Sequence, residues 1–498
     1  SKTRVSQLLN SSTDHSLEKY VMDCFKCLTN DCDMNMFTVF DVKKVFKQLK
    51  KCKSSGMDGL SAEHYIYADD RVHVLFSLLF NSMIVHGFIP QSLMDSMIIP
   101  LLKDCKGDIS DKDNYRPIAI TCISSKIVEL LILDRYSDCF STSDNQFSFK
   151  SNHSTEMCAF VLKETIDYYK AHSSPIYLCY VDASKAFDRI NFWHMSDKLL
   201  SRGLPKIFVR LFVYWFTSQN FSVKWCNVIS APFTSSNGLR QGGILSPLLF
   251  NVYVDDLSSL LRKSNVGCHV NDVCINHLFY ADDAVLMAPS PYALQKLIDI
   301  CESFASENEM TYNAKKTVCM YIMPHKFNNV NVPDMYLNGK VLKCVTEQKY
   351  LGIFITSEFS DNRDITRQIR STYCRGNFLI SKFRKCSNEV KVQLFISFCS
   401  NLYCSSLWSS YRKDVFNRLH VAHNNVFRML MGLDKRCSIS NVLVQNNVDG
   451  FHALMRKNVF SLRERVFSSD NTLIFACVTH NFFIFKSAIN KQWCSILY

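Results

Sequence analysis

A run of seven residues, Ile176 to Asp182, is rich in β-forming side chains and ends in a carboxylate. Such a run predicts a buried strand. A charge at the end of a buried strand costs free energy unless a counter-charge neutralises it, and a metal ion would do so. The run therefore predicts a core strand that carries a candidate cation ligand, Asp182, at its end. The role of Asp188, six residues further on, stays open.

A second acidic position lies in His277–Met287, where two apolar halves flank Asp282 and Asp283. This pattern predicts a β-hairpin whose tight turn presents two carboxylates. Taken alone, two adjacent acids in a turn are more often simply solvated. Together with Asp182 they supply three carboxylates, enough to hold two hard cations roughly 3.5–4 Å apart.

Between these segments lies Gly238–Phe250, with Gly242 and Gly243 directly before an apolar helix pattern over Leu248–Leu261. The glycines allow positive φ or close backbone approach, and Ser246-Pro247 marks a helix start. This arrangement suits a platform against which a base pair could stack. Taken alone, it is also an ordinary loop-to-helix junction.

The four letters of Tyr280–Asp283 occur a second time, at Tyr67–Asp70. The earlier copy is followed by Arg71 and His73 rather than by an apolar half-hairpin. We therefore expect Ser61–Tyr67 to be helical, with Asp69-Asp70 as its solvated end, and we take the later copy as the catalytic candidate.

The length of 498 residues predicts two to four structural units, and 47% hydrophobic with 20% charged residues is an ordinary globular composition. No apolar run is long enough to predict a membrane span, and no secretion signal is visible. The chain does not begin with Met and is expected to be part of something longer.

The 22 cysteines are expected to be reduced and mostly buried. Cys24, Cys27 and Cys32 have part of a zinc-like spacing, but core packing is favoured because no second ligand pair follows.

The net charge of +12 is concentrated in one region. Between Asp361 and Asp470 there are 18 Lys/Arg and 8 Asp/Glu, so 18 − 8 gives +10, and aromatic residues are interleaved with the basic ones at Tyr373–Arg375, Phe378 and Phe383–Lys385. A nucleic-acid backbone is a natural partner for such a face. The alternative is a solvated helical surface, and the position after a catalytic core favours nucleic acid.

The order of these segments resembles the reverse transcriptases of non-LTR (LINE-type) retrotransposons, from about Val39 to Gly352. The matching pieces in chain order are KSSGMDGL (53–60), IIPLLKDCKGD (98–108), NYRPIAI (114–120), YVDASKAFDRI (180–190), GLRQGGILSPLLF (238–250), FYADDAVLM (279–287), YNAKKT (312–317) and YLGIFI (350–355).

This resemblance implies a role for each matching residue. The implied metal ligands are the carboxylates of Asp182, Asp282 and Asp283, assisted by the carbonyl of Val181 or Ala183. Lys316 would donate a proton to pyrophosphate. The incoming nucleotide would meet Lys103 and Arg116 at its triphosphate, Gln241 and Gly242 near its sugar, and Phe187 under the sugar, where an added 2′-hydroxyl would clash. The primer end would be gripped by Tyr350, Leu351 and Gly352.

Each assignment outside the acidic triad has a plainer alternative. Phe187 could be a core aromatic, and Lys315 could take the place of Lys316. Arg116, in extended backbone before Pro117, could be solvated. Tyr350 could be ordinary sheet packing.

The predicted fold class is α+β, the right-hand polymerase, with fingers, a palm that contains an antiparallel sheet, and a helical thumb. The predicted divisions are a helical extension over 1–95, fingers and palm over 96–360, and a basic helical thumb and C-terminal region over 361–498. Asp41–Leu49 and Arg71–Val85 are expected as helices, and Ile98–Leu102 and Ile118–Cys122 as strands.

The resemblance implies an RNA-directed DNA polymerase that uses two Mg²⁺ ions, with Mn²⁺ as an alternative. Its partners would be an RNA template, a DNA primer or nicked target DNA, and dNTPs, in nuclear and cytoplasmic ribonucleoprotein, with no membrane. No endonuclease, RNase H-like or protease segment is expected. Two other functions stay open, an RNA-directed RNA polymerase and an inactive remnant that only binds RNA.

Overall fold

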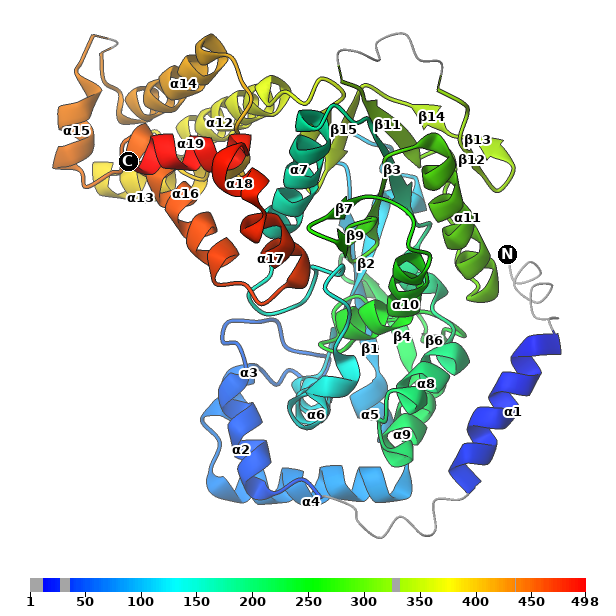
Figure 1. The fold of residues 1–498 in the computed structure, drawn as a ribbon. Helices are drawn as coiled ribbons and strands as arrows, with labels where there is room; N and C mark the ends of the chain where they lie inside the picture. Colours follow the sequence, from blue (N-terminus) through cyan, green and yellow to red (C-terminus); the bar gives the residue numbers. More distant parts are fainter. Residues whose placement is uncertain (1–11, 27–35, 325–331, 435) are drawn as a thin grey trace. The chain divides into compact units, whose positions relative to one another are not determined.

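The structure, a computed structural model, describes residues 12–26, 36–324, 332–434 and 436–498 (Figure 1). Cys27 and Cys32 of the zinc-like spacing lie outside these ranges. The chain forms two compact units. The first unit comprises Ser1–Ser143, Ser184–Asp256 and Phe304–Thr311, and the second comprises Asp144–Ala183, Leu257–Ser303 and Tyr312–Tyr498. Both units contain helices and a sheet, which confirms the α+β class. None of the helices in the described ranges is long and apolar enough to span a membrane.

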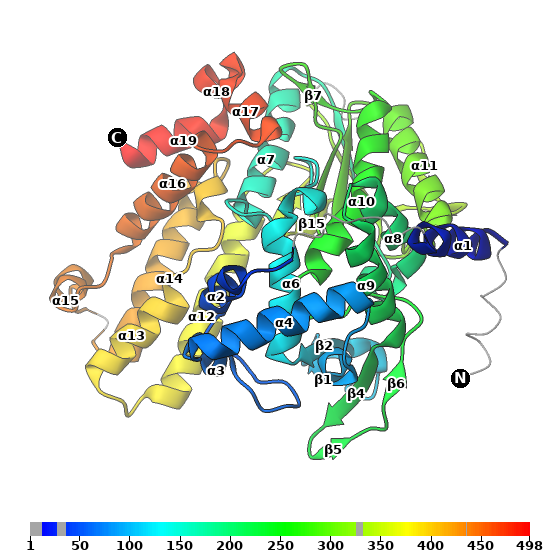
Figure 2. The ribbon, with the colours of Figure 1, turned by 90° about the horizontal axis from the view of Figure 1, so that it is seen from below.

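The sheet of the first unit has the order β2-β1-β4-β5, with β6 also paired to β4. The antiparallel pair β1–β2 forms a long hairpin in which Leu101 faces Arg116. Figure 2 shows β4, β5 and β6 running together at one end of this sheet. The bounds are β1 Ser96–Leu102, β2 Tyr115–Thr121, β4 Asn220–Trp225, β5 Val228–Ile229 and β6 Phe233–Thr234. The strands predicted at Ile98–Leu102 and Ile118–Cys122 are confirmed as β1 and β2.

The helices of the first unit follow the predicted pattern. Thr38 and Asp41 form a capping box at the start of α2, and Gly87, at φ +61°, ends α4. The bounds are α1 Ser12–Lys26, α2 Val39–Gln48, α3 Ala62–Ile66, α4 Asp70–His86, α5 Gln91–Met94, α6 Ile123–Arg135, α8 Phe192–Ser201, α9 Lys206–Ser218 and α10 Ser246–Lys263, which continues into the second unit. The helices predicted at 41–49, 71–85 and 248–261 are confirmed.

The earlier copy of the acidic tetrapeptide joins two helices. Tyr67 ends α3, and Asp69 caps α4 by accepting a hydrogen bond from the backbone N of Arg71 at 2.9 Å. Asp70 lies in the first turn of α4 and pairs with Lys43 at 2.7 Å. The two acids are exposed as predicted, but they begin the following helix instead of ending the preceding one. The reason is that a carboxylate stabilises the positive end of a helix.

The sheet of the second unit has the order β14-β11-β3-β10-β9. Its central strand β3 spans Ile176–Asp182, as predicted, and is paired antiparallel on both sides, with β10 and with β11. The other bounds are β9 His277–Tyr280, β10 Asp283–Ala288, β11 Val318–Ile322 and β14 Lys343–Cys344. Smaller hairpins are β7–β8 (His269–Val270, Val273–Cys274), β12–β13 (Tyr336–Leu337, Lys340–Val341) and β15–β16 (Glu347–Tyr350, Ile353–Thr356).

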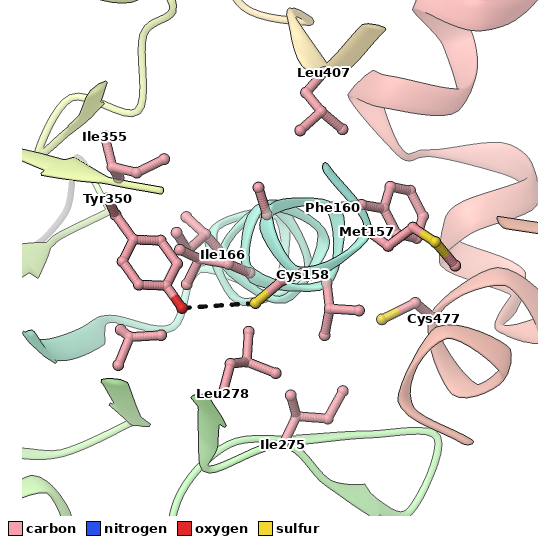
Figure 3. Packing of buried hydrophobic residues seen from close by; sticks show 14 of the residues in the cluster. Met157, Cys158, Phe160, Ile166, Ile275, Leu278, Tyr350, Ile355, Leu407 and Cys477 are labelled. Carbon is pink, nitrogen blue, oxygen red and sulfur yellow. Dashed lines mark hydrogen bonds between the residues drawn. The ribbon is translucent and has the colours of Figure 1, made fainter. Parts of the chain in front are cut away.

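Helix α7 (Thr155–Ala171) packs between this sheet and the helices α16 and α17 (Figure 1). The core around it joins residues far apart in sequence, and the hydroxyl of Tyr350 lies 3.6 Å from the Cys158 sulfur (Figure 3). The remaining helices are α11 Pro291–Glu307, α12 Asn362–Phe383, α13 Asn388–Cys399, α14 Lys413–Met431, α15 Ile439–Gln445, α16 Phe451–Phe467, α17 Thr472–Thr479, α18 Asn481–Phe485 and α19 Ala488–Leu497.

The last helices share the core of the central sheet. Trp493 stacks on Phe160 of α7 with ring centroids 5.6 Å apart, and Ser487 donates a hydrogen bond to Glu164 at 2.8 Å. Two further apolar clusters are formed by residues within 365–455, although Cys404 and Leu407 belong to the core of the central sheet. The predicted division at 361–498 therefore remains a proposal, with its last part packed on α7.

Glu164→Gln is expected to remove a pH dependence of stability. Burial raises the pKa of Glu164 from 4.5 to about 8. Below pH 4.5 the Glu164 carboxyl is protonated in both the folded and the unfolded state, and its contribution to stability is fully present. This contribution is lost as the pH rises from 4.5 through about 8, because the unfolded chain ionises first. The loss is on the order of 4–5 kcal/mol. The free energy of unfolding at pH 5 and pH 9 should therefore differ less in Glu164→Gln than in the parent. The exposed Glu464→Gln should behave like the parent, and an equal pH dependence in all three would contradict the assignment.

Candidate active site

Two of the predicted acids are direct neighbours across the central sheet of the second unit. Asp283, the first residue of β10, is the register partner of Asp182, the last residue of β3. Side chains of directly opposed residues project from the same face of a sheet. Asp283 also pairs with Tyr280 of β9, so Ala281 and Asp282 form the two-residue turn of the predicted hairpin.

The hairpin turn is held in a conformation that costs free energy in isolation. Ala281 has φ +57°, which is unusual for a residue with a Cβ. Its backbone N donates to the Gln146 side-chain oxygen at 3.1 Å and to the Ser148 hydroxyl at 2.9 Å. Both partners are buried. The turn that carries Asp282 is therefore fixed by a preceding, distant segment of the same unit.

Asp182 is held on its other side by the 312–317 segment. Its backbone N donates to the Thr317 hydroxyl at 3.2 Å, and its carbonyl accepts from the N of Asn313 at 2.8 Å. The Lys316 ammonium lies 4.0 Å from the Asp182 carboxylate. Lys315 instead uses its backbone N to bond the Asn313 side chain. Of the two candidate lysines, Lys316 is the one placed beside the acid.

The acids perturb one another. Burial, together with the charges of Asp282 and Asp182, raises the pKa of Asp283 to about 6. Burial also raises the pKa of Asp182, which the neighbouring Lys316 lowers and Asp282 raises. Groups that are shifted by mutual repulsion are stabilised in their charged form by a cation. Carboxylates are also the ligands that hard divalent cations prefer.

Within the described residues, no group of three or more His, Cys, Asp or Glu side chains meets the geometry of a preformed metal site. The chemistry of the donor set nevertheless fits divalent cations, since two of the acids share a sheet face and repel each other. Val181 precedes Asp182 in β3 and is buried.

The glycine-containing loop lies in the first unit and extends the β1–β2 hairpin. The N of Ala119 on β2 donates to the carbonyl of Gln241 at 2.7 Å. Gly242 follows at φ +132°, and a Cβ on it would lie 2.3 Å from the Ala119 carbonyl oxygen. The prediction that a glycine allows close backbone approach here is confirmed.

Phe187 lies in the same unit, in a short 3₁₀ turn, and is half-buried. Its ring stacks on that of Phe250 in α10, with centroids 4.6 Å apart and planes at 10°. The ring is therefore fixed in orientation. This is consistent with both alternatives, a core aromatic and a ring under the nucleotide sugar.

Lys103 and Arg116 both lie on the exposed β1–β2 hairpin. The ammonium of Lys103 donates to the carbonyl of Asp113 at 2.7 Å. Residues of this hairpin and of the glycine-containing loop line a cavity of about 160 Å³. Its lining residues are Ile98, Pro117, Ala119, Asp188, Phe221, Phe233, Ser235, Asn237, Gly238, Leu239, Arg240 and Gln241.

Residues 105–355 match the family model described as "Reverse transcriptase (RNA-dependent DNA polymerase)". The chain belongs to the reverse transcriptase family. The match spans the acidic hairpin, the glycine-containing loop and β3. The predicted membership among the reverse transcriptases of non-LTR elements is confirmed by the relatives.

The RNA-directed DNA polymerase from mobile element jockey of Drosophila funebris is 25% identical over 464 residues, which are 88% of this chain and 48% of that protein. The retrovirus-related Pol polyprotein of element R2DM from Drosophila melanogaster is 28% identical over 250 residues, 49% of this chain and 24% of that protein. The chain spans less than half the length of these relatives. The apo telomerase structure from Candida tropicalis aligns with a TM-score of 0.43 at 12% identity, over 85% of this chain and 71% of that one, a likeness too weak to support an argument.

In this reverse transcriptase two of the three predicted primer-grip residues, Leu351 and Gly352, form a two-residue hairpin turn between β15 and β16, and Tyr350 ends β15. Leu351 and Gly352 have φ values of +46° and +84°, and the hydroxyl of Tyr403 donates to the Leu351 carbonyl at 2.8 Å. The Tyr350 ring, by contrast, is buried, and its centroid lies 5.5 Å from that of Tyr180. Its hydroxyl points toward the Cys158 sulfur (Figure 3). The Tyr350 side chain therefore packs in the core, whereas Leu351 and Gly352 of the turn are half-buried.

The basic region of the reverse transcriptase is helical, as predicted, but not all of its charge is available. Arg363 pairs with Glu347 at 2.8 Å and Arg367 with Asp364 at 2.7 Å. Tyr373 and Phe383 pack into apolar clusters, whereas Phe378 is 54% exposed. The exposed side of α12 forms what we call the basic stripe, namely Arg370, Phe378 and Lys382, at helical spacing.

One buried ion pair was not foreseen from the sequence. Arg240, within the glycine-containing motif, pairs with Glu129 of α6, and both side chains are almost fully buried. Glu129 lies 111 residues away and carries no local signal of such a role. Arg240 could have been suspected, because a charge inside an apolar motif needs a partner.

Proposed function

We propose that the chain is an RNA-directed DNA polymerase, the reverse transcriptase of a non-LTR retrotransposon, which extends a DNA 3′-hydroxyl on an RNA template. The observation that carries the proposal is the register pairing of Asp182 with Asp283, with Asp282 in the adjoining hairpin turn. Three carboxylates at the end of one buried strand pair are the donors that nucleotidyl transfer requires.

Reverse transcriptases generally use divalent metal ions. Asp182, Asp282 and Asp283 would hold two Mg²⁺ ions, or Mn²⁺ in their place, with the Val181 carbonyl assisting. Bound there, the ions would lower the pKa of the primer hydroxyl and neutralise the leaving pyrophosphate. Lys316, already 4.0 Å from Asp182, would hold the proton that pyrophosphate receives.

The first unit would bind the incoming dNTP. Arg116 and Lys103 are exposed on one hairpin and offer cations to the triphosphate, where the planar guanidinium suits phosphate oxygens. Gln241 and Gly242 would contact the sugar side. The stack on Phe250 supports the role of Phe187 as a rigid wall under the sugar. A ring that cannot move aside would clash with the 2′-hydroxyl of a ribonucleotide.

The template–primer duplex would meet the basic stripe of α12 and the Leu351-Gly352 turn. Contacts to phosphates fix the position of a duplex without reading its sequence. Partners would be the RNA template and a primer or nicked target DNA, in nuclear and cytoplasmic ribonucleoprotein.

The proposal is tested by primer extension with matched templates and nucleotides. The parent chain with Mg²⁺ should extend a DNA primer on an RNA template with dNTPs, and should extend it poorly with rNTPs. Efficient ribonucleotide incorporation would favour an RNA-directed RNA polymerase. RNA binding without any extension, beside an active control enzyme, would favour an inactive remnant.

Phe187→Ala is expected to relax sugar selection. Removing the ring opens space under the sugar, so the ratio of kcat/KM for dNTP over rNTP should fall by about tenfold to a hundredfold. The control is Phe88→Ala, since Phe88 also contacts an aromatic ring, that of Tyr214, and lies in the same unit. A ratio unchanged in Phe187→Ala would return Phe187 to a purely structural role.

A further inference from the structure

We infer that Glu129 and Arg240 form a positioning clamp that fixes the backbone of Gln241–Gly243 for nucleotide selection. The inference rests on the proposed function, because it assumes that Gln241 and Gly242 meet the incoming nucleotide. Neither Glu129 nor Arg240 is proposed to touch substrate.

The Glu129 carboxylate, 3% exposed, binds three donors from one short segment. One oxygen accepts from the guanidinium of Arg240. The other accepts from the backbone N of Ile244 at 2.5 Å and of Leu245 at 3.3 Å. A single side chain therefore holds both ends of the segment 241–243.

Arg240 is fixed on its second face by an aromatic ring. Its guanidinium lies 4.5 Å from the ring centroid of Trp215 in α9, and Trp215 is 1% exposed. A buried ion pair is weak evidence for stability, because desolvation offsets much of the attraction. Its presence at this position is better explained by the geometry that it imposes on the loop.

The segment between the two anchor points is intrinsically loose. Two of its three residues are Gly242 and Gly243, which lose more backbone entropy on ordering than other residues do. Close packing excludes larger residues, since a Cβ on Gly243 would lie 2.6 Å from the Ser246 hydroxyl and 3.1 Å from the Arg240 Nε. By holding both ends of the segment, the clamp restricts the backbone conformations that the two glycines can adopt.

The clamp also reaches the proposed sugar wall. Ile244 and Leu245 directly precede α10, and their N–H groups belong to the region where a helix start leaves donors unsatisfied. Phe250, on which Phe187 stacks, lies in the first turns of this helix. Fixing the start of α10 thus fixes Gln241 and Phe187 together.

The first test measures amide hydrogen exchange in Glu129→Gln, which keeps the shape but removes the charge and presents an amide to Arg240. Exchange should rise in peptides covering 240–250 and stay unchanged in β3 and β10. The control is Arg202→Met, which breaks the ion pair of Arg202 with Asp255 (2.6 Å) in the same unit. Equal increases in both variants, or an increase spread over the whole unit, would overturn the clamp.

The second test is steady-state primer extension by the same variants. Glu129→Gln should raise the KM for dNTP by about tenfold to a hundredfold, with a smaller loss of kcat, and should lower sugar discrimination. Arg240→Lys, which keeps the charge but loses the planar ring contact, should lie between parent and Glu129→Gln. A local rise in exchange with unchanged KM and sugar selection would overturn the positioning role. An inactive parent would contradict the proposed function instead, while the exchange test would still decide the clamp.

Discussion

Asp182→Asn is expected to lose primer extension by at least about a thousandfold, roughly 4 kcal/mol in the barrier, without losing stability. The substitution keeps the shape of the side chain but removes a negative charge that burial and Asp282 disfavour by more than Lys316 favours it, since the pKa of Asp182 is raised overall. In metal-free buffer the variant should therefore unfold at the same temperature as the parent or higher. Single-turnover extension and thermal unfolding measure the two effects separately.

The metal response of the same variant gives a second readout. Mg²⁺ or Mn²⁺ should raise the unfolding temperature of the parent, because an ion that binds the folded state stabilises it. Asp182→Asn should respond less. Full activity in Asp182→Asn, or a lower unfolding temperature that explains its inactivity, would contradict the role given to this residue.

Gly242→Ala is expected to disrupt the first unit locally and to reduce activity more than about a hundredfold. The added Cβ would lie 2.3 Å from the carbonyl oxygen of Ala119, and the φ of +132° is already unfavourable for a residue with a side chain. The Ala119–Gln241 hydrogen bond would have to break, or β2 and the glycine-containing loop would have to shift apart. Melting temperature and kcat/KM should both fall.

The matched control is Gly203→Ala in the same unit. Gly203 also has positive φ, +81°, but a Cβ there meets nothing within 4 Å. It should cost on the order of 1–2 kcal/mol of stability from the backbone alone and leave kcat/KM unchanged. Equal effects of the two substitutions would mean that the contact with Ala119 is unimportant.

Much of the acidic site was predictable because its signals are local. The strand Ile176–Asp182 has its predicted bounds, since a continuous apolar run paired on both sides has few alternatives. The hairpin around Asp282 follows from two apolar halves around a polar pair. These patterns require only neighbouring residues, and the structure agrees with them.

What was not predictable depends on partners far apart in sequence. Gln146 and Ser148, which hold the turn at Ala281, lie more than 130 residues before it. Glu129 and Arg240 meet across 111 residues. The burial of Tyr350 results from α7 packing against its hairpin (Figure 3), and no local pattern distinguishes a buried tyrosine from an exposed one. The prediction that Asp69 ends the preceding helix was likewise wrong. An acidic residue between two helices can end the first or cap the second, and only its hydrogen-bond partner, here the backbone N of Arg71, distinguishes the two.

The most direct test of the central claim compares primer extension on an RNA template, with dNTPs and Mg²⁺, by the parent, Asp282→Asn and Asp69→Asn. The last variant makes the same change in the duplicate tetrapeptide, where Asn can still cap α4. We predict extension by the parent and by Asp69→Asn and none by Asp282→Asn. Extension by Asp282→Asn at the parent rate, or its loss in Asp69→Asn alone, would contradict the assignment of catalysis to the hairpin of β9 and β10.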